Sequence, residues 1–227
     1  MPSPEPNPGL DPFDGAAVRA LRWTAGLLIS GCVGALVRIE DSGVPDGLPG
    51  GARPLLVTNH RSPLDYFIVV AVCRSRGYWP AMFAREDFFY RRTSRYALRS
   101  LALIPAARGR GVGEGLIRAG RMLDQGQVVA IAAEGGLIRA QDTPDGVGRL
   151  RSGAGRLADA GADVTVLTIL GAEAAWAPGS ARPRLRMPWR RPQVTVRARS
   201  LPPLARISPR EATRAIRVAM VELAGER

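Results

Sequence analysis

The sequence has few reactive side chains, and these shortages already exclude several kinds of site. It contains no lysine, one histidine (His60) and two cysteines (Cys32 and Cys73) among 227 residues. A structural zinc site needs four His or Cys ligands, so this inventory excludes one and we expect no metal. Both cysteines lie in apolar stretches, which predicts two free, buried thiols in a reducing compartment. Catalysis by an imidazole depends on His60.

Acidic residues are also scarce relative to basic ones. The chain has 20 acidic residues and 32 arginines, which gives a net charge of +12. The excess lies in two blocks: residues 74–110 hold nine arginines against two acidic residues, and residues 182–217 hold eleven against one. Such blocks suit nucleic acids, anionic lipid headgroups or phosphorylated small molecules, and a solvated basic face is the alternative. Because no nucleic-acid reader motif is present, no nucleic-acid partner is expected.

The N-terminal region divides into two parts. Residues 1–15 are proline-rich and predict a disordered arm. No basic segment precedes an apolar run there, so no signal peptide is expected. Residues 16–40 predict an apolar membrane-associating helix, with a 15-residue uncharged stretch from Trp23 to Val37. That stretch would be about 22 Å long against the ~30 Å hydrocarbon core, so it would dip into one leaflet. An ordinary buried helix is the alternative.

The remaining residues, 50–227, alternate short apolar stretches with helical patterns. We expect strands at residues 55–58, 101–106, 128–133, 164–170 and 194–198, and helices at 64–73, 114–123, 152–160 and 209–224. Strands that alternate with helices predict a single α/β domain with a mostly parallel central sheet flanked by helices.

The single histidine follows the first of these strands, where open α/β sheets place their ligands. Ser62 is a suitable N-cap for the next helix, Pro63 suits its first position, and Asp65 then falls at N3. Asp65 can therefore fold back toward His60, fix its tautomer and leave the other ring nitrogen free to accept a proton. A structural histidine is the alternative for His60. Ser62 as a nucleophile is another, although its capping role is simpler.

Residues 59–65, Asn-His-Arg-Ser-Pro-Leu-Asp, resemble the N-H-x4-D motif of the glycerolipid acyltransferases, the lysophosphatidic acid acyltransferase family. Further segments resemble later motifs of that family in the same order. These segments are Leu103–Arg108, Ala133–Gly136, Leu150–Gly153 and Val166–Ile169. The resemblance covers about residues 50–200. The expected acyltransferase domain extends further, over residues 50–227.

The resemblance implies transfer of a fatty acyl group from acyl-CoA or acyl-carrier protein to a lysophospholipid hydroxyl in phospholipid biosynthesis. His60 would be the general base and Asp65 would orient it, without a cofactor beyond the acyl thioester. The implied substrate-binding residues are Asn59, Arg61, Ser62, Arg108, Glu134, Gly135, Gly136 and Arg139. The implied partner is an anionic membrane surface, on the cytoplasmic face of the cell membrane.

The third motif departs from the family pattern, which bears on the acceptor. Ala132-Ala133 stand where the family has Phe-Pro, and Gly136-Leu137 stand where it has Thr-Arg. Arg139 is near enough to replace the missing charge. Two alternatives therefore stay open: a degenerate member that binds lipid without turnover, and an enzyme that acylates a lipid outside phosphatidate synthesis.

Overall fold

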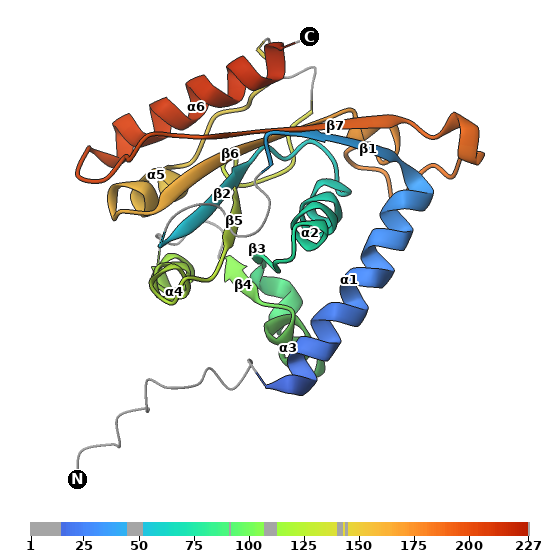
Figure 1. The fold of residues 1–227 in the computed structure, drawn as a ribbon, viewed down its shortest axis with the longest axis horizontal. Coiled ribbons are helices and arrows are strands. Elements are labelled where there is room, and N and C mark those ends of the chain that lie inside the picture. The colour runs from blue at the N-terminus through green and yellow to red at the C-terminus, as the bar shows by residue number, and fades with distance from the viewer. Residues whose placement is uncertain are drawn as a thin grey trace.

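The computed structural model describes residues 15–44, 52–90, 92–106, 113–139, 143 and 145–226, and in them strands alternate with helices (Figure 1). The helices are α1 (Ala16–Leu36), α2 (Asp65–Ser75), α3 (Arg92–Ser100), α4 (Gly113–Asp124), α5 (Ser152–Asp159) and α6 (Pro209–Gly225). The strands are β1 (Arg38–Ser42), β2 (Pro54–Thr58), β3 (Ala81–Arg85), β4 (Leu103–Ala106), β5 (Val129–Ala132), β6 (Asp163–Leu170) and β7 (Gln193–Ser200). Single 3-10 turns are η1 (Glu86–Phe89), η3 (Ala172–Ala174) and η4 (Pro188–Arg190).

Within the described residues the strands form one seven-stranded sheet in the order β1-β7-β6-β2-β5-β3-β4. β2 lies at its centre, parallel to β5 on one side and to β6 on the other. β3 and β4 extend the parallel part. β7 runs antiparallel to β6, and β1 is parallel to β7 at the edge. The predicted single α/β domain with a mostly parallel sheet is therefore confirmed.

Helices cover both faces of this sheet. Leu55 and Val57 of β2 are fully buried in one core, which α4, α5 and α6 complete. Leu56 points to the opposite core, formed with α2 and the end of α1. Figure 1 shows α5 and α6 on one side of the sheet and α1 and α2 on the other. Because β2 is buried on both faces, its sequence is a continuous apolar run rather than an alternating one.

The N-terminal helix α1 is longer than the uncharged stretch from which it was predicted. It has 21 residues, which corresponds to about 32 Å at 1.5 Å per residue. Arg22 fits inside it because its Nε donates to the Ser100 carbonyl at 2.8 Å. The predicted range to residue 40 runs too far, since β1 begins at Arg38. Among the described residues, α1 is a helix long and apolar enough to cross a membrane, by length and composition.

One face of α1 packs on the domain and the rest is open. At Gly26 a Cβ atom would lie 2.5 Å from Cδ of Arg74, so the Arg74 side chain of α2 packs directly over this glycine. Trp23, Leu27 and Leu28 are exposed on the remainder of the helix, and only 11% of its most apolar window is buried. An exposed apolar helix surface suits membrane association better than a position in the core of a soluble domain.

The two cysteines differ, contrary to the prediction that both are buried. Cys73 lies in α2 and is fully buried, and this burial raises the pKa of its thiol to about 12. Cys32 is exposed on α1. The apolar neighbours of Cys32 in the sequence belong to a helix that the domain does not enclose, which is why its burial was predicted wrongly.

Candidate active site

The loop between β2 and α2 carries the single histidine. β2 ends at Thr58 in the middle of the sheet, so His60 lies just beyond the carboxyl end of a central strand. The backbone of this loop is tied to a second loop, because Ile138 N–H donates to the His60 carbonyl at 2.9 Å. The structure thus places His60 where it was predicted, at the carboxyl ends of the parallel strands.

Asp65 folds back on this loop, as expected from the spacing. Its Oδ2 lies 3.4 Å from Nδ1 of His60, which is longer than an ideal hydrogen bond and within ion-pair distance. The same oxygen accepts the N–H groups of Arg61 and Ser62, each at 2.7 Å. Asp65 is 2% exposed, whereas the side chain of His60 is 24% exposed. The carboxylate is therefore fixed behind the imidazole, whose other nitrogen remains available.

The start of α2 shows the predicted capping contacts. The regular helix begins at Asp65, one residue later than predicted. Ser62 Oγ accepts the Leu64 N–H at 3.1 Å, and the Asp65 carboxylate accepts the Ser62 N–H at 2.7 Å, which are the bonds of an N-cap and of a residue at N3. Ser62 Oγ also donates to the Trp176 carbonyl at 2.7 Å. With Oγ of Ser62 engaged on both sides, the geometry favours the structural role over the nucleophilic one.

Glu134 holds the histidine loop from the opposite side. It follows β5, and its Oε2 accepts the His60 N–H at 2.8 Å while its Oε1 accepts the Gly148 N–H at 2.6 Å. The side chain is 4% exposed. Both oxygens are therefore engaged with backbone groups of this chain. The structure shows Glu134 positioning the histidine loop, and its assignment to substrate binding stays a prediction.

Asn59 and Arg61 are also buried around the loop. The amide of Asn59 makes two bonds to Ile169 in β6, donating to its carbonyl and accepting its N–H, both at 2.8 Å. Arg61 is 8% exposed, and its guanidinium packs where a Cβ on Gly146 would stand, 2.6 Å from Nη2. Its Nε and Nη2 have no hydrogen-bond partner in the described part of the chain. Asn59 thus fixes the loop to β6.

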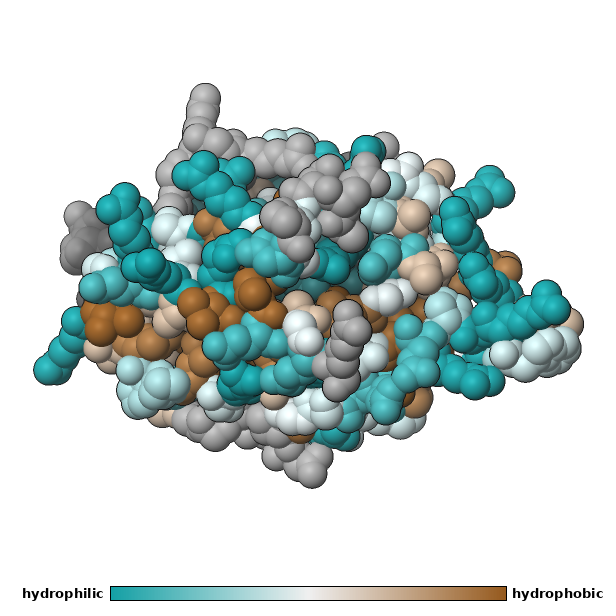
Figure 2. All heavy atoms as spheres, turned by 90° about the horizontal axis from the view of Figure 1, so that it is seen from above, coloured by the Kyte–Doolittle hydropathy of each residue, from teal (hydrophilic) through white to brown (hydrophobic). Residues whose placement is uncertain are grey.

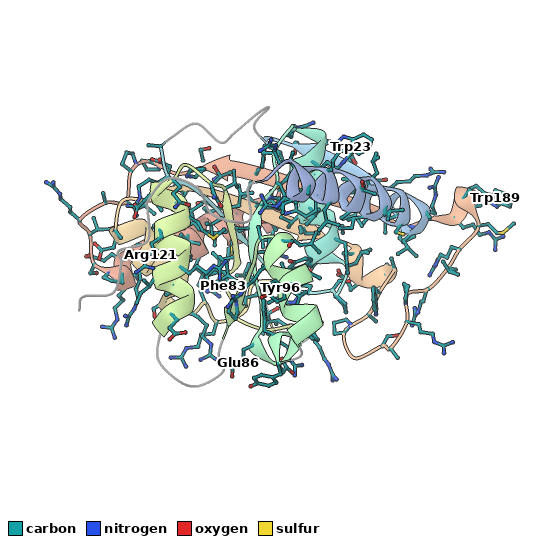
Figure 3. The ribbon with its side chains drawn as sticks, turned by 90° about the horizontal axis from the view of Figure 1, so that it is seen from below. Trp23, Phe83, Glu86, Tyr96, Arg121 and Trp189 are labelled. Carbon is teal, nitrogen blue, oxygen red and sulfur yellow. The ribbon has the colours of Figure 1, made fainter. Side chains whose placement is uncertain are left out.

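A cavity of about 380 Å³ opens beside His60 and Asp65. Its lining is mostly apolar, and it includes two glycines of the third motif. The lining residues are Thr58, Asn59, His60, Asp65, Tyr66, Val69, Met82, Phe83, Ala84, Arg85, Ala106, Ala130, Ala132, Gly135, Gly136 and Leu137. Figure 3 shows Phe83 between α4, which carries Arg121, and α3, which carries Tyr96. An apolar chamber that begins at a histidine–carboxylate pair suits a substrate with a hydrocarbon chain.

Sequence reasoning found only part of this lining. Gly135 and Gly136, which were predicted to bind substrate, line the cavity, and their role in binding stays a prediction. Gly135 has φ +68°, with Cγ of Arg151 3.0 Å from the position of a Cβ. Arg139 is exposed and does not line the cavity. Arg108 lies outside the described residues. Val69 was missed, although it lies one helical turn after Asp65 and so shares its face, a signal that the sequence already contains.

The apolar wall opposite α2 was missed for another reason. Met82 and Phe83 come from β3, a strand that the sequence analysis did not predict. Met82 is buried and pairs with Ala130 of β5 across the parallel ladder. These side chains reach the cavity only because β3 joins the sheet beside β5.

The fold and this site together define an α/β enzyme with a histidine–carboxylate pair at the mouth of an apolar cavity. A family model described as Acyltransferase matches residues 40–170, more than half of the chain. The chain therefore belongs to the acyltransferase family, and the prediction of an acyltransferase is confirmed.

A solved structure shares the fold. The crystal structure of the 1-acyl-sn-glycerophosphate (LPA) acyltransferase PlsC from Thermotoga maritima superposes with a TM-score of 0.64. The match covers 93% of this chain and 83% of that chain, at 17% sequence identity. No curated protein sequence matches the chain. The similarity to the Thermotoga enzyme thus extends over nearly the whole chain and concerns the fold.

Proposed function

We propose that the protein transfers a fatty acyl group from an acyl thioester, acyl-CoA or acyl-carrier protein, to the hydroxyl of a lysophospholipid such as 1-acyl-glycerol-3-phosphate. The observation that carries this proposal is the His60–Asp65 pair, 3.4 Å apart, at the mouth of the apolar cavity of about 380 Å³. Membership of the acyltransferase family supports the reaction type. The name of the Thermotoga enzyme supports the acceptor.

In the proposed reaction, His60 acts through the ring nitrogen that faces away from Asp65. The acceptor hydroxyl gives its proton to this nitrogen as its oxygen attacks the thioester carbonyl carbon. The tetrahedral intermediate then collapses, the C–S bond breaks, and the thiolate takes the proton from the imidazolium. Asp65 stabilises the imidazolium between these steps. No covalent acyl-enzyme and no cofactor beyond the thioester are required.

The cavity supplies a place for the acyl chain. Its buried end is formed by Val69, Met82 and Ala130, which are at most 5% exposed. Each methylene buried there contributes about 0.8 kcal/mol. Glu134 holds the His60 backbone through its N–H. Such fixed positioning of the base relative to the bound chain is a large part of the catalysis that a single-displacement enzyme needs.

We propose that the enzyme works at the cytoplasmic face of the cell membrane, attached through α1. The uncharged segment from Trp23 to Val37 would enter the bilayer. The proposed acyl donors are cytoplasmic, and the proposed acceptor is a membrane lipid. Both substrates would therefore meet where α1 leaves the membrane.

A panel of labelled substrates tests this function. The full chain is incubated in mixed micelles with radiolabelled acyl-CoA or acyl-carrier protein and one of three acceptors: lysophosphatidic acid, lysophosphatidylcholine or monoacylglycerol. The proposal expects labelled phosphatidic acid from the first acceptor. His60→Ala gives the background, and Gln125→Ala, which changes an exposed side chain after α4, is the matched control.

Each other outcome has a definite meaning. Product from monoacylglycerol but not from lysophosphatidic acid would retain the reaction and reject the phosphate-bearing acceptor, which the Gly136-Leu137 departure makes a specific alternative. Binding of acceptors without any product would identify a lipid-binding member of the family and reject the proposed function.

A further inference from the structure

The connection between β6 and β7 carries a group of exposed large apolar side chains. Residues 181–192, which we call the arginine arm, extend from the domain before β7. In it Leu185 is 82% exposed, Met187 55% and Trp189 66%. Single exposed apolar residues are common, but three large ones within five positions are unusual on a surface that faces only water.

The arm is held in shape by backbone hydrogen bonds rather than by burial. Arg184 N–H donates to the Ala175 carbonyl at 2.7 Å, and Arg190 N–H donates to the Met187 carbonyl at 2.8 Å. The 3-10 turn η4 lies within it. Because these bonds fix the backbone while the side chains stay in solvent, the arm presents its apolar residues to a partner outside the chain.

Positive charge surrounds these apolar residues. The arm contains five arginines: Arg182, Arg184, Arg186, Arg190 and Arg191. The sequence has no acidic residue between Glu173 and Glu211. In the part of the chain that the structure describes, the first four of these arginines make no salt bridge. Figure 2 shows hydrophilic side chains projecting from the end of the molecule where the arm lies. The partner that complements this surface is anionic, and the guanidinium fork fits phosphate.

The arm is joined directly to the apolar helix. Arg191 Nη1 donates to the carbonyl of Gly34 in α1, and the Arg38 N–H donates to the Pro192 carbonyl at 2.9 Å. Gly34 lies within the uncharged part of α1. Figure 3 shows α1 ending beside the arm, with Trp189 projecting beyond it. If the uncharged part of α1 enters a bilayer, the arm is therefore carried to the bilayer surface.

We propose that the arginine arm binds the surface of an anionic phospholipid bilayer, with Leu185, Met187 and Trp189 inserted among the headgroups and its arginines bound to lipid phosphates. This proposal rests on the proposed function in one respect, which is that α1 attaches the protein to a membrane. Tryptophan prefers the headgroup level of a bilayer, and basic residues are drawn to anionic lipids. A nucleic acid would satisfy the arginines but would leave Leu185 and Met187 in water.

The root of the arm touches the candidate active site. Ser62, two residues after His60, donates to the Trp176 carbonyl at 2.7 Å, and Trp176 Nε1 donates to the Ser180 carbonyl at 3.0 Å. A bound arm would therefore hold the histidine loop close to the lipid surface.

Vesicle binding by two sets of variants tests the arm. One variant removes its apolar tip (L185S, M187S and W189S), and the other removes its free charge (R182Q, R184Q, R186Q and R190Q) and keeps Arg191 for its bond to α1. The full chain is partitioned onto vesicles of phosphatidylcholine alone and of phosphatidylcholine mixed with phosphatidylglycerol. We expect the first variant to bind both kinds about tenfold more weakly, and the second to lose the preference for phosphatidylglycerol.

Matched controls lie on the opposite side of the molecule. I117S with V218S removes two exposed apolar residues, and R149Q, R156Q, R210Q and R214Q removes four exposed arginines. Both controls should bind like the unchanged chain. A site-specific probe separates the arm from α1: an environment-sensitive dye on M187C, in a C32S background, should shift to the blue on anionic vesicles. No shift, or arm variants that bind like the controls, would overturn the proposal.

Activity with substrates dispersed in detergent distinguishes this proposal from the proposed function. Both arm variants should retain acyl transfer in micelles, because the arm does not line the cavity. An unchanged chain that transfers no acyl group, together with weakened vesicle binding by the arm variants, would support the arm and reject the function. Loss of micelle activity in the arm variants, with their fold intact by circular dichroism, would count against a purely membrane-binding role.

Discussion

Two connections leave adjacent strands of the sheet and use their polar residues in opposite ways. After β2, the loop to α2 is buried, and the side chains of Asn59, Ser62 and Asp65 each make a hydrogen bond to the backbone. After β6, the connection to β7 begins equally buried at Ala172 and ends in the exposed arginine arm. The histidine loop holds atoms at fixed distances, which a reaction requires. The arm leaves its large apolar side chains in solvent, which suits a deformable partner such as a lipid surface.

Among the residues that surround His60, the largest effect should come from the carboxylate of the histidine loop. Asp65→Asn keeps an oxygen that can accept the loop amides but removes the charge that stabilises the imidazolium. We expect acyl transfer to fall about 10²-fold or more, with the thermal midpoint changed much less. Rates in mixed micelles and a thermal melt measure the two quantities. A rate within twofold of the unchanged chain would show that the 3.4 Å pair is only structural.

The next effect should come from Glu134, which connects the histidine loop to the residue 148 loop. Glu134→Gln replaces one accepting oxygen by a donor facing a backbone N–H, so we expect about 1–3 kcal/mol loss of stability. Displacement of His60 should lower the rate about tenfold. Urea unfolding and acyl transfer measure both, with Glu222→Gln, an exposed residue paired to Arg199, as control. Equal behaviour of the two variants would contradict the bracing role of Glu134.

A change in chain-length preference should follow from filling the cavity. Ala130 lies at its buried end, so Ala130→Leu should shorten the preferred acyl chain by about two to three carbons, since leucine adds three. Val69→Ala should move the preference the other way. Competition among labelled acyl thioesters of different chain lengths measures this change in preference. Identical preferences in both variants would place the acyl chain outside this cavity.

The smallest effect should come from one residue of the arm. Trp189→Ser should weaken binding to anionic vesicles about three- to tenfold, with no change in thermal midpoint, because Trp189 is 66% exposed and packs little. If Trp189→Ser lost as much thermal stability as Glu134→Gln, the arm would be packed like the histidine loop, and the difference between the two connections would be wrong.

The strongly apolar parts of the fold could be predicted from the sequence. β2 and β5 are short apolar runs, and β6 is mostly apolar. α6 has a capping box between Ser208 and Glu211, with Pro209 at its first position. β1 was missed because Arg38, Glu40 and Asp41 give it no apolar run. It exists because β7 pairs with it along its whole length.

The candidate site could be predicted only where it is local. The His60–Asp65 pair follows from a spacing of five residues. The bond between His60 and Glu134 joins residues 74 positions apart, and only the pairing of β2 with β5 brings them together. The family resemblance identified Glu134 as a site residue, but no motif predicted its two hydrogen bonds to backbone N–H groups. The arm was visible in the sequence only as charge, since exposure of Leu185 and Trp189 is a property of the fold.

One comparison of rates decides whether His60 is the base of a direct acyl transfer. Acyl transfer in mixed micelles is measured for His60→Ala and Ser62→Ala, with an acid quench to detect label bound to the protein. We expect a loss of about 10²–10⁴-fold for His60→Ala, a much smaller loss for Ser62→Ala, and no label on the protein. Transfer by His60→Ala at the unchanged rate, or labelled acyl groups on Ser62, would contradict this role of His60.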